Sequence, residues 1–459
     1  MDNTIYSPQN YACLLVFLFA WSWAFESADL AGAEDSPPNL VLKQAQDAYD
    51  TGNFEQALQL LDPLVGPKTS LPSAQRLKML SLARLGKTAE GLNEYEQIIK
   101  NSGREDEELL RQLAITTILP LRADMREQMR GAAYTALKEV DSDEVLPYLE
   151  EGLADGSGMI RALVAEGIGN LPSGPSSKKF RHALHDQAGW VRATVIKGLG
   201  RTGDKDVIPL IEPFLKDDQA LVQVAAAGAL FALGKEKYWA RIEQAASSPE
   251  GYERGAAMRI LGDLADARAI PILVKGMDDH QPTIRVASAS ALGNLGLSQG
   301  VPYLVEALTN GIPSLRTAAA VSLGKLNATQ VIPLLEKSLL DQDPGVQAAA
   351  VDALLKLQTP FRVVEPTIRN LMGHKNPGIR SGAARALANG KTRDVMGPLT
   401  LLLRDPVPRP RITAVRSIGR VGGRSVLAQL KTALRDQDNA VQATAAGALA
   451  RILSTPAKT

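Results

Sequence analysis

Residues 284–296, IRVASASALGNLG, contain the pattern that decides the fold, because this pattern recurs along the chain at one fixed distance. Arg285 marks the position in this copy, and we call the equivalent residue of every copy the anchor. The anchors are Arg130, Arg161, Arg192, Gln223, Arg254, Arg285, Arg316, Gln347, Arg380, Arg411 and Gln442. Nine of the ten intervals are 31 residues and the other, before Arg380, is 33. Self-similarity at such a period predicts a solenoid of stacked units.

Each unit is predicted to contain two helices. Small or apolar residues follow the anchor at helical spacing, as Ser288, Ala289 and Leu292 do. Proline fits the first turn of a helix, where its missing N–H would be unpaired. Two sets of prolines therefore mark helix starts, one about seventeen residues after the anchor and one three residues before it. The members are Pro147, Pro209, Pro271, Pro302 and Pro333, and then Pro282, Pro344, Pro377 and Pro408.

An aspartate recurs six residues before eight of the eleven anchors. Together with the basic anchors it predicts a ladder of ion pairs between repeats, with Asp124, Arg130, Asp155, Arg161, Asp186, Arg192, Asp279, Arg285, Asp405 and Arg411 among its members. We expect Arg285→Ala to lower the free energy of unfolding by about 1 to 3 kcal/mol, because Asp279 or a neighbouring repeat's acid loses its partner. The unit around residues 248–254 lacks the acid, so we expect it to be bent or locally exposed.

The period and the paired aspartate and arginine resemble the HEAT repeat family, in the short form of the phycobilisome lyase-like proteins. The resemblance covers about residues 107–455. It implies an all-α fold, a right-handed α-solenoid of HEAT-like helical hairpins. The family includes scaffolds, lyases and hydroxylases, so the resemblance alone does not choose a function.

The N-terminal region has a different organisation. Residues 12–25, ACLLVFLFAWSWAF, are an apolar run followed by the triplet 31–33, AGA, which predicts a signal peptide or export leader over residues 1–33. An uncut membrane anchor is the alternative, and it is disfavoured because the run is shorter than the roughly 20 residues that span a bilayer. Residues 34–39 are a predicted linker. Residues 40–106 resemble tetratricopeptide repeats in the spacing of Ala45, Tyr49, Gly52, Phe54 and Ala57, and in Gly86 one 34-residue period after Gly52, which predicts a helical cap.

Charge is distributed unevenly along a chain whose net charge is only +1. Residues 34–155 contain 13 basic and 22 acidic residues, whereas residues 355–435 contain 16 basic and 3 acidic residues. The second segment is therefore a candidate site for an acidic partner.

The sequence offers little for catalysis. Its only cysteine, Cys13, lies in the predicted leader, so we expect no thiol chemistry in the mature chain. His182 and His185 are three residues apart beside Asp186, but two histidines and one acid are fewer ligands than a supported metal site needs. The HEAT-like deoxyhypusine hydroxylases hold iron with His-Glu pairs, and this sequence has no His-Glu dipeptide. We predict no catalytic residues, no cofactor and no metal.

A ligand is expected on the second helix of each unit, which lines the concave surface of such arrays. Positions five and nine residues after the anchor share one helical face because they are four residues apart. Toward the C-terminal end this face contains the candidate partner-binding residues Lys325, Lys356, Arg385, Arg416, Arg420 and Arg451. An ordinary solvated surface is the alternative reading of these charges.

These observations favour a non-catalytic, exported scaffold, periplasmic or extracellular, that binds an acidic protein partner. Self-association through the acidic N-terminal segment is a second route to binding. A nucleic-acid or other polyanion binder would use the same basic face, although a leader argues against access to DNA. A phycobilin lyase-like or hydroxylase-like enzyme is the third alternative. Contact with a membrane would require an uncleaved leader.

Overall fold

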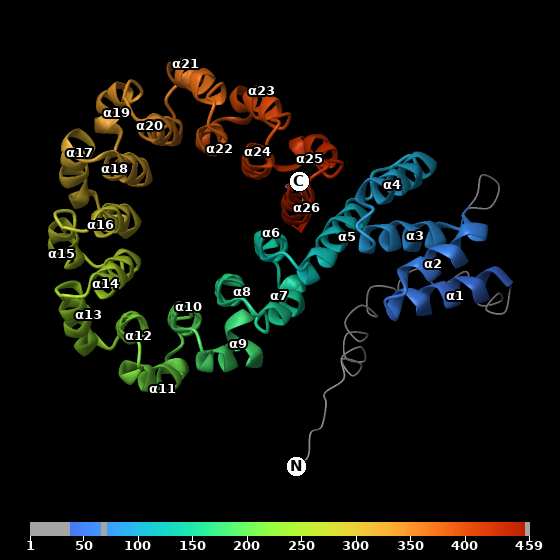
Figure 1. Cartoon of the computed structure of the whole chain (residues 1–459), viewed down its shortest axis with the longest axis horizontal. Helices are drawn as coiled ribbons and strands as arrows, with labels where there is room; N and C mark the ends of the chain where they lie inside the picture. The colour runs from blue at the N-terminus through green and yellow to red at the C-terminus, as the bar shows by residue number, and fades with distance from the viewer. Residues whose placement is uncertain (1–36, 66–70, 455–459) are drawn as a thin grey trace, which may run out of the picture. The chain divides into compact units, whose positions relative to one another are not determined.

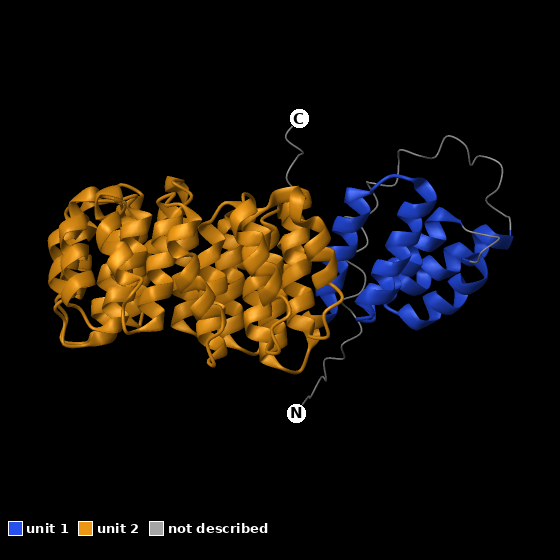
Figure 2. Ribbon diagram, turned by 90° about the horizontal axis from the view of Figure 1, so that it is seen from above, with its two compact units in different colours: residues 1–120 blue, residues 121–459 orange. Residues whose placement is uncertain are grey.

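The computed structural model describes residues 37–65 and 71–454, and within them no β-strand is present. The all-α solenoid expected from the sequence is confirmed. The chain forms two compact units, Met1–Pro120 and Leu121–Thr459 (Figure 2). Residues 107–118, which the sequence assigned to the repeat array, lie in unit 1. The predicted leader lies outside the described residues, and in the described part no helix has the length and apolarity to span a membrane.

The described part of unit 1 has five α-helices that form hairpins. They are α1 (Pro37–Asp50), α2 (Phe54–Leu61), α3 (Pro72–Arg84), α4 (Thr88–Ser102) and α5 (Glu107–Ile118). The α1–α2 and α3–α4 turns each contain a glycine with positive φ, 84° at Gly52 and 74° at Gly86, a conformation that other residues rarely adopt. Ala45 and Ala57 are fully buried, and the rings of Tyr49 and Phe54 meet edge to face at 5.3 Å.

Unit 2 has an inner and an outer layer of helices (Figure 1). Every anchor lies on an inner helix. The inner helices are α6 (Glu127–Val140), α8 (Gly158–Asn170), α10 (Gly189–Gly200), α12 (Ala220–Ala232), α14 (Gly251–Asp263), α16 (Pro282–Leu295), α18 (Pro313–Lys325), α20 (Pro344–Lys356), α22 (Pro377–Ala386), α24 (Pro408–Val421) and α26 (Asn439–Ser454).

The outer helices connect the inner ones and are generally shorter. They are α7 (Leu146–Gly152), α9 (Lys178–His182), α11 (Ile208–Ile211), α13 (Trp239–Ala246), α15 (Ala269–Gly276), α17 (Val301–Asn310), α19 (Ile332–Ser338), α21 (Phe361–Met372), α23 (Thr392–Leu402) and α25 (Leu427–Ala433). Proline occupies the first turn of α7, α11, α17 and α19, and of the five inner helices α16 to α24.

Unit 2 closes into a ring, because the last inner helix, α26, packs directly on the first, α6 (Figure 1). The two backbones cross closely at Gly447, where an added Cβ would lie 2.6 Å from the carbonyl oxygen of Ala136. An open solenoid needs terminal repeats with a polar outer face. Instead, α26 is alanine-rich and buried on almost all sides, which its position between α24 and α6 explains.

The ladder connects seven of the eight arginine anchors to the aspartate of the following repeat. The seven pairs have N–O distances of 2.5–2.8 Å and are Arg130–Asp155, Arg161–Asp186, Arg192–Asp217, Arg254–Asp279, Arg316–Asp341, Arg380–Asp405 and Arg411–Asp436. Asp124, which opens the first inner repeat, pairs with the neighbouring Arg126. The expected partnership of Arg285 with Asp279 is not formed, because the Asp279 carboxylate binds Arg254. Arg285 donates to the Asp279 carbonyl oxygen at 2.7 Å.

The repeat around residues 248–254 replaces the missing ladder step with another network. Gln223 is the anchor before it, and the outer-helix residue Arg241 donates to the Gln223 side-chain oxygen at 3.0 Å and to Glu253 at 2.7 Å. Ser248 also donates to Glu253, at 2.7 Å. The outer helix α13 is thereby attached to α14 without an aspartate.

Candidate binding surface inside the ring

Residues five and nine positions after the anchors face the opening of the ring, and we call them the lumen positions. Two ion pairs show their direction. Lys197 of α10 reaches over α12 to Asp263 of α14 at 2.5 Å, and Arg416 of α24 reaches over α26 to Glu139 of α6 at 2.6 Å. A side chain can reach past the adjacent inner helix to the inner helix beyond it only on the concave side of the array. The helix passed over has glycine at the fifth position in both cases, Gly228 and Gly447.

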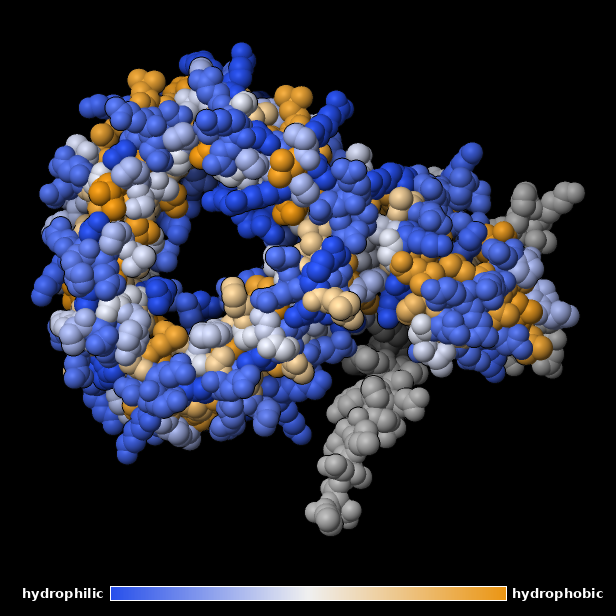
Figure 3. Space-filling model, in the orientation of Figure 1, coloured by the Kyte–Doolittle hydropathy of each residue, from blue (hydrophilic) through white to orange (hydrophobic). Residues whose placement is uncertain are grey.

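The lumen positions are predominantly basic. Across the eleven inner helices they include nine basic and four acidic residues, a net of five positive charges. The basic residues are Lys197, Arg201, Arg259, Lys325, Lys356, Arg385, Arg416, Arg420 and Arg451. Figure 3 shows an open channel through the ring, with hydrophilic residues projecting into it.

Three of the predicted partner-binding residues already have acceptors inside the ring. Lys325 donates to Asn294 at 2.8 Å, Arg416 is held by Glu139, and Arg451 donates to the Gly419 carbonyl oxygen at 2.6 Å. Arg416 therefore stabilises the seam between α24, α26 and α6. The sequence could not indicate this pairing, because the two residues are 277 positions apart.

The other three predicted residues, Lys356, Arg385 and Arg420, have no hydrogen-bond acceptor within the described residues. Lys356 and Arg385 lie near Asp352, whose pKa is raised by burial against the opposing effects of Asn389 and these cations. Asn389 donates to the Asp352 carboxylate at 2.7 Å. This part of the lumen thus contains more cationic groups than its single carboxylate can neutralise.

Three lumen cations were not selected from the sequence, namely Lys197, Arg201 and Arg259. They occupy the same two positions on α10 and α14 as the selected residues, so the register alone could have identified them. Arg201 donates to Asn170 at 2.9 Å. Arg259 has no acceptor within the described residues, and partial removal from water lowers its pKa.

The ring size limits what can enter the lumen. Eleven inner helices about 9 Å apart form a circle about 32 Å across between helix axes, and subtracting a helix diameter of about 11 Å leaves about 20 Å. A helix or an extended chain fits this width. A domain of about 100 residues, with a radius of gyration of about 13 Å, does not.

Within the described residues, no group of three or more His, Cys, Asp or Glu side chains is arranged to hold a metal ion. His182 and His185 lie with their rings 6.1 Å apart, and His185 also contacts Phe214 on the outer layer.

Comparisons with known proteins agree on the repeat type. The family model for HEAT repeats matches residues 177–246, 239–323 and 395–459, and the model for the PBS lyase HEAT-like repeat matches residues 315–341. No protein of curated function matches the sequence.

Many solved structures are similar to this chain, and three of them illustrate the range. The complex of CpcE and CpcF of phycocyanin lyase from Nostoc is 19% identical, covering 51% of this chain and 91% of that one, with a TM-score of 0.36. Human deoxyhypusine hydroxylase is 19% identical, covering 55% and 98%, with a TM-score of 0.29. An engineered protein is 18% identical, covering 74% and 98%, with a TM-score of 0.30. From the repeats themselves and the family models that match them, the chain is a HEAT-repeat protein whose units include the PBS lyase HEAT-like kind.

Proposed function

We propose that this protein is a non-catalytic scaffold whose ring lumen binds an acidic polypeptide segment. The observation that carries the proposal is the presence of nine basic against four acidic residues at the lumen positions, together with the lack of a hydrogen-bond acceptor for Lys356, Arg385 and Arg420 among the described residues. Positive charge on a concave wall raises the local concentration of an anionic ligand and accelerates its association. The lumen width of about 20 Å favours a segment over a folded domain.

Charge reversal at the unpaired residues tests this function. We expect the triple variant K356E/R385E/R420E to bind a fluorescent polyglutamate probe at least tenfold more weakly, about 1.4 kcal/mol, with an unchanged circular dichroism spectrum. Arg416 is left intact because it holds the seam. The matched control, R362E/K391E/R393E, makes the same charge change on the outer helices α21 and α23 and at Lys391, the residue before α23, and should retain affinity. Equal affinity of both triple variants would refute the proposal.

A nucleic-acid or other polyanion binder is the second candidate, since the same cations would contact phosphates. Binding of single-stranded DNA would show a steep linear dependence of log affinity on log salt concentration. Competition between polyglutamate and single-stranded DNA at physiological salt separates the two candidates. Co-purification from intact cells, with mass spectrometry, identifies the natural partner.

The proposed location is outside the cytoplasm, on the basis of the predicted leader. N-terminal sequencing of the native protein tests it. A mature N-terminus at or near Glu34 would support export, whereas an intact Met1 on cytoplasmic protein would contradict it.

A further inference from the structure

The lumen has a second chemical feature, a row of large apolar side chains on four consecutive inner helices. Met159, Trp190, Leu221 and Tyr252 each lie two residues before an anchor, on α8, α10, α12 and α14 respectively. We call these four residues the apolar row. The exposed fractions are 71% for Met159, 50% for Trp190 and 63% for Tyr252, which is unusual for large apolar groups. The equivalent residues of α16 to α26 are Thr283, Ser314, Gly345, Gly378, Arg409 and Ala440.

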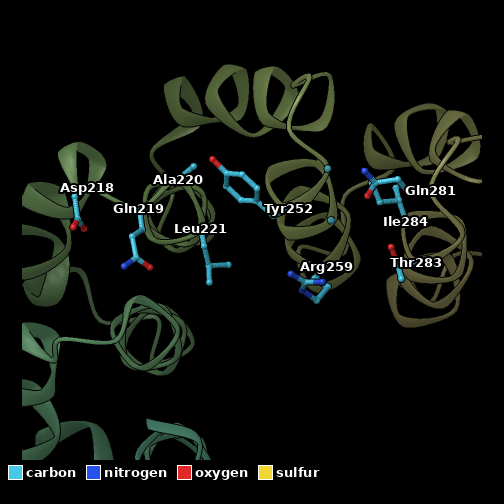
Figure 4. A pocket seen from close by; sticks show the side chains of 11 residues that line it. Asp218, Gln219, Ala220, Leu221, Tyr252, Arg259, Gln281, Thr283 and Ile284 are labelled. Carbon is cyan, nitrogen blue, oxygen red and sulfur yellow. The ribbon is translucent and has the colours of Figure 1, made fainter.

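By helical register the apolar row lies on the lumen side of its helices, and the Tyr252 ring itself lies between α12 and α14 with its hydroxyl toward the outer helix (Figure 4). Each residue of the apolar row precedes a lumen position by seven residues, which is two helical turns and therefore the same helix face. Two pockets confirm the shared face. One is lined by Met159, Lys197 and Arg201, among others, and the other by Leu221, Tyr252 and Arg259. In Figure 4, Leu221 and Arg259 lie on the side of α12 and α14 away from the outer helix, with Tyr252 between these two inner helices.

The glycines of this arc leave space for the exposed groups. Gly158 lies beneath the Trp190 indole, which would be 3.2 Å from an added Cβ. Gly251 and Gly255 line the larger pocket, which has a volume of about 570 Å³ between α12, α14 and the start of α16. In the arc from α16 to α24, proline occupies the position of Gly158 and Gly251. The two arcs therefore differ both in backbone and in side chains.

A basic residue lies next to the apolar row, two helical turns further along the same helix face. Arg259 lies two turns below Tyr252 in the same pocket and has no acceptor within the described residues. An apolar group seated against Tyr252 and Leu221 would bring a neighbouring carboxylate close to this guanidinium. A purely apolar occupant would leave Arg259 without a counter-charge, so the site is complementary to a ligand that is both apolar and acidic.

We propose that the arc from α8 to α14 binds an acidic peptide segment in the polyproline II conformation, with a large apolar side chain at every third residue. Neighbouring inner helices are about 9 Å apart, and one turn of a polyproline II helix, three residues long, rises about 9 Å and returns the side chain to the same face. Successive apolar side chains therefore meet successive members of the apolar row. Acidic residues between them face Arg201 and Arg259, since Lys197 is already paired with Asp263. This inference rests on the proposed function and names the sequence pattern that the lumen selects.

Trp190 provides a direct readout. The chain has four tryptophans, so the full-length variant W21F/W23F/W239F retains only Trp190. The probe is a synthetic peptide of about twelve residues with phenylalanine at every third position and glutamate elsewhere. Two control peptides have the same phenylalanines gathered at one end, or serine in place of phenylalanine. We expect the first peptide to shift Trp190 emission to shorter wavelength and to bind at least tenfold more tightly than either control.

Matched variants separate this inference from the proposed function. W190S/Y252S should lose at least tenfold in affinity for the patterned peptide and bind the serine peptide unchanged. L340S/L401S replaces two equally exposed apolar residues of the outer layer, 84% and 64% exposed, and should bind like the parent protein. If all three peptides bind equally and W190S/Y252S has no effect, the lumen recognises charge alone and this inference fails. If no acidic peptide binds at low salt, the proposed function fails as well.

Discussion

Each arginine anchor except Arg285 binds both a carboxylate and a backbone carbonyl oxygen, and the separate contributions of these contacts can be measured. Arg254 donates through Nε and Nη2 to the Asp279 carboxylate and through Nη1 to the carbonyl oxygens of Ser248 and Pro249. The glutamine anchors Gln223 and Gln347 donate only to the carbonyl oxygen of the aspartate six residues earlier. Both precede a repeat with no aspartate at the ladder position. The anchor is therefore arginine in every repeat that is followed by a ladder aspartate. Arg285 is the one arginine anchor that no ladder aspartate follows.

We expect Arg254→Ala to lower the free energy of unfolding by about 3 kcal/mol, because it leaves the nearly buried Asp279 carboxylate without its cation. Arg254→Gln should cost less, since glutamine can keep the carbonyl bond. Arg285→Ala should cost about 1 kcal/mol, because only hydrogen bonds to carbonyl oxygens are lost. Urea unfolding measures all three. Equal losses for Arg254→Ala and Arg285→Ala would show that the ion pair adds nothing.

Between elements, the ladder makes the stacking of the inner helices sensitive to acid. Hydrogen bonds from Arg254, Arg316 and Arg380 hold the pKa values of Asp279, Asp341 and Asp405 below their usual range, against the opposing effect of burial. The unfolded value is about 3.9, so the folded aspartates bind protons less readily than the unfolded ones. Their stabilisation is complete above that value and is lost as pH falls through the lower folded values.

We therefore expect the urea midpoint to fall steeply below about pH 4 and to be insensitive to these groups between pH 5 and 8. Arg254→Gln removes one ladder pair and should show a smaller loss between pH 5 and pH 3 than the parent protein. The comparison isolates the contribution of Asp279 from the general effect of acid. An identical pH profile for the two proteins would contradict a role of the ladder in acid sensitivity.

The elements themselves could be predicted from the sequence because each repeat folds by local rules. Anchor spacing and helix-initiating prolines located the inner helices, and the four-residue spacing of the lumen positions located their shared face. Two features were missed because they are visible only when neighbouring repeats are compared. The partner of Asp279 is Arg254 of the preceding unit, and the apolar row appears only when residues two before the anchors are compared across four units.

At the scale of unit 2, closure could not be predicted from the repeat pattern, because it depends on small rotations accumulated over eleven inner helices. One signal was present in the sequence. Residues 439–452 of α26 have alanine, glycine or apolar residues on nearly every face, which a terminal repeat exposed to water would not tolerate. Arg416, which the sequence predicted as a binding residue, instead pairs with Glu139, because closure of the ring brings the two side chains within 2.6 Å of each other.

A single methyl group at the seam tests whether the ring is closed in solution. An alanine Cβ at position 447 would lie 2.6 Å from the Ala136 carbonyl oxygen and 2.9 Å from its Cα, so Gly447→Ala must displace α26 from α6. We expect amide hydrogen exchange to accelerate in α6 and α26, while α14 to α20 keep their protection, because repeats contact only their neighbours. Small-angle scattering should show a larger maximum dimension.

Gly397→Ala is the matched control, since an added Cβ meets nothing within 4 Å at this position inside α23. It should leave exchange at the seam unchanged and raise stability slightly, by roughly 0.5 to 1 kcal/mol, through the lower entropy of the unfolded chain. If both variants give the parent protein's exchange pattern and scattering curve, α26 and α6 are not in contact in solution, and unit 2 is an open solenoid. Its lumen would then be a groove, accessible from the side to segments that a closed ring admits only by threading.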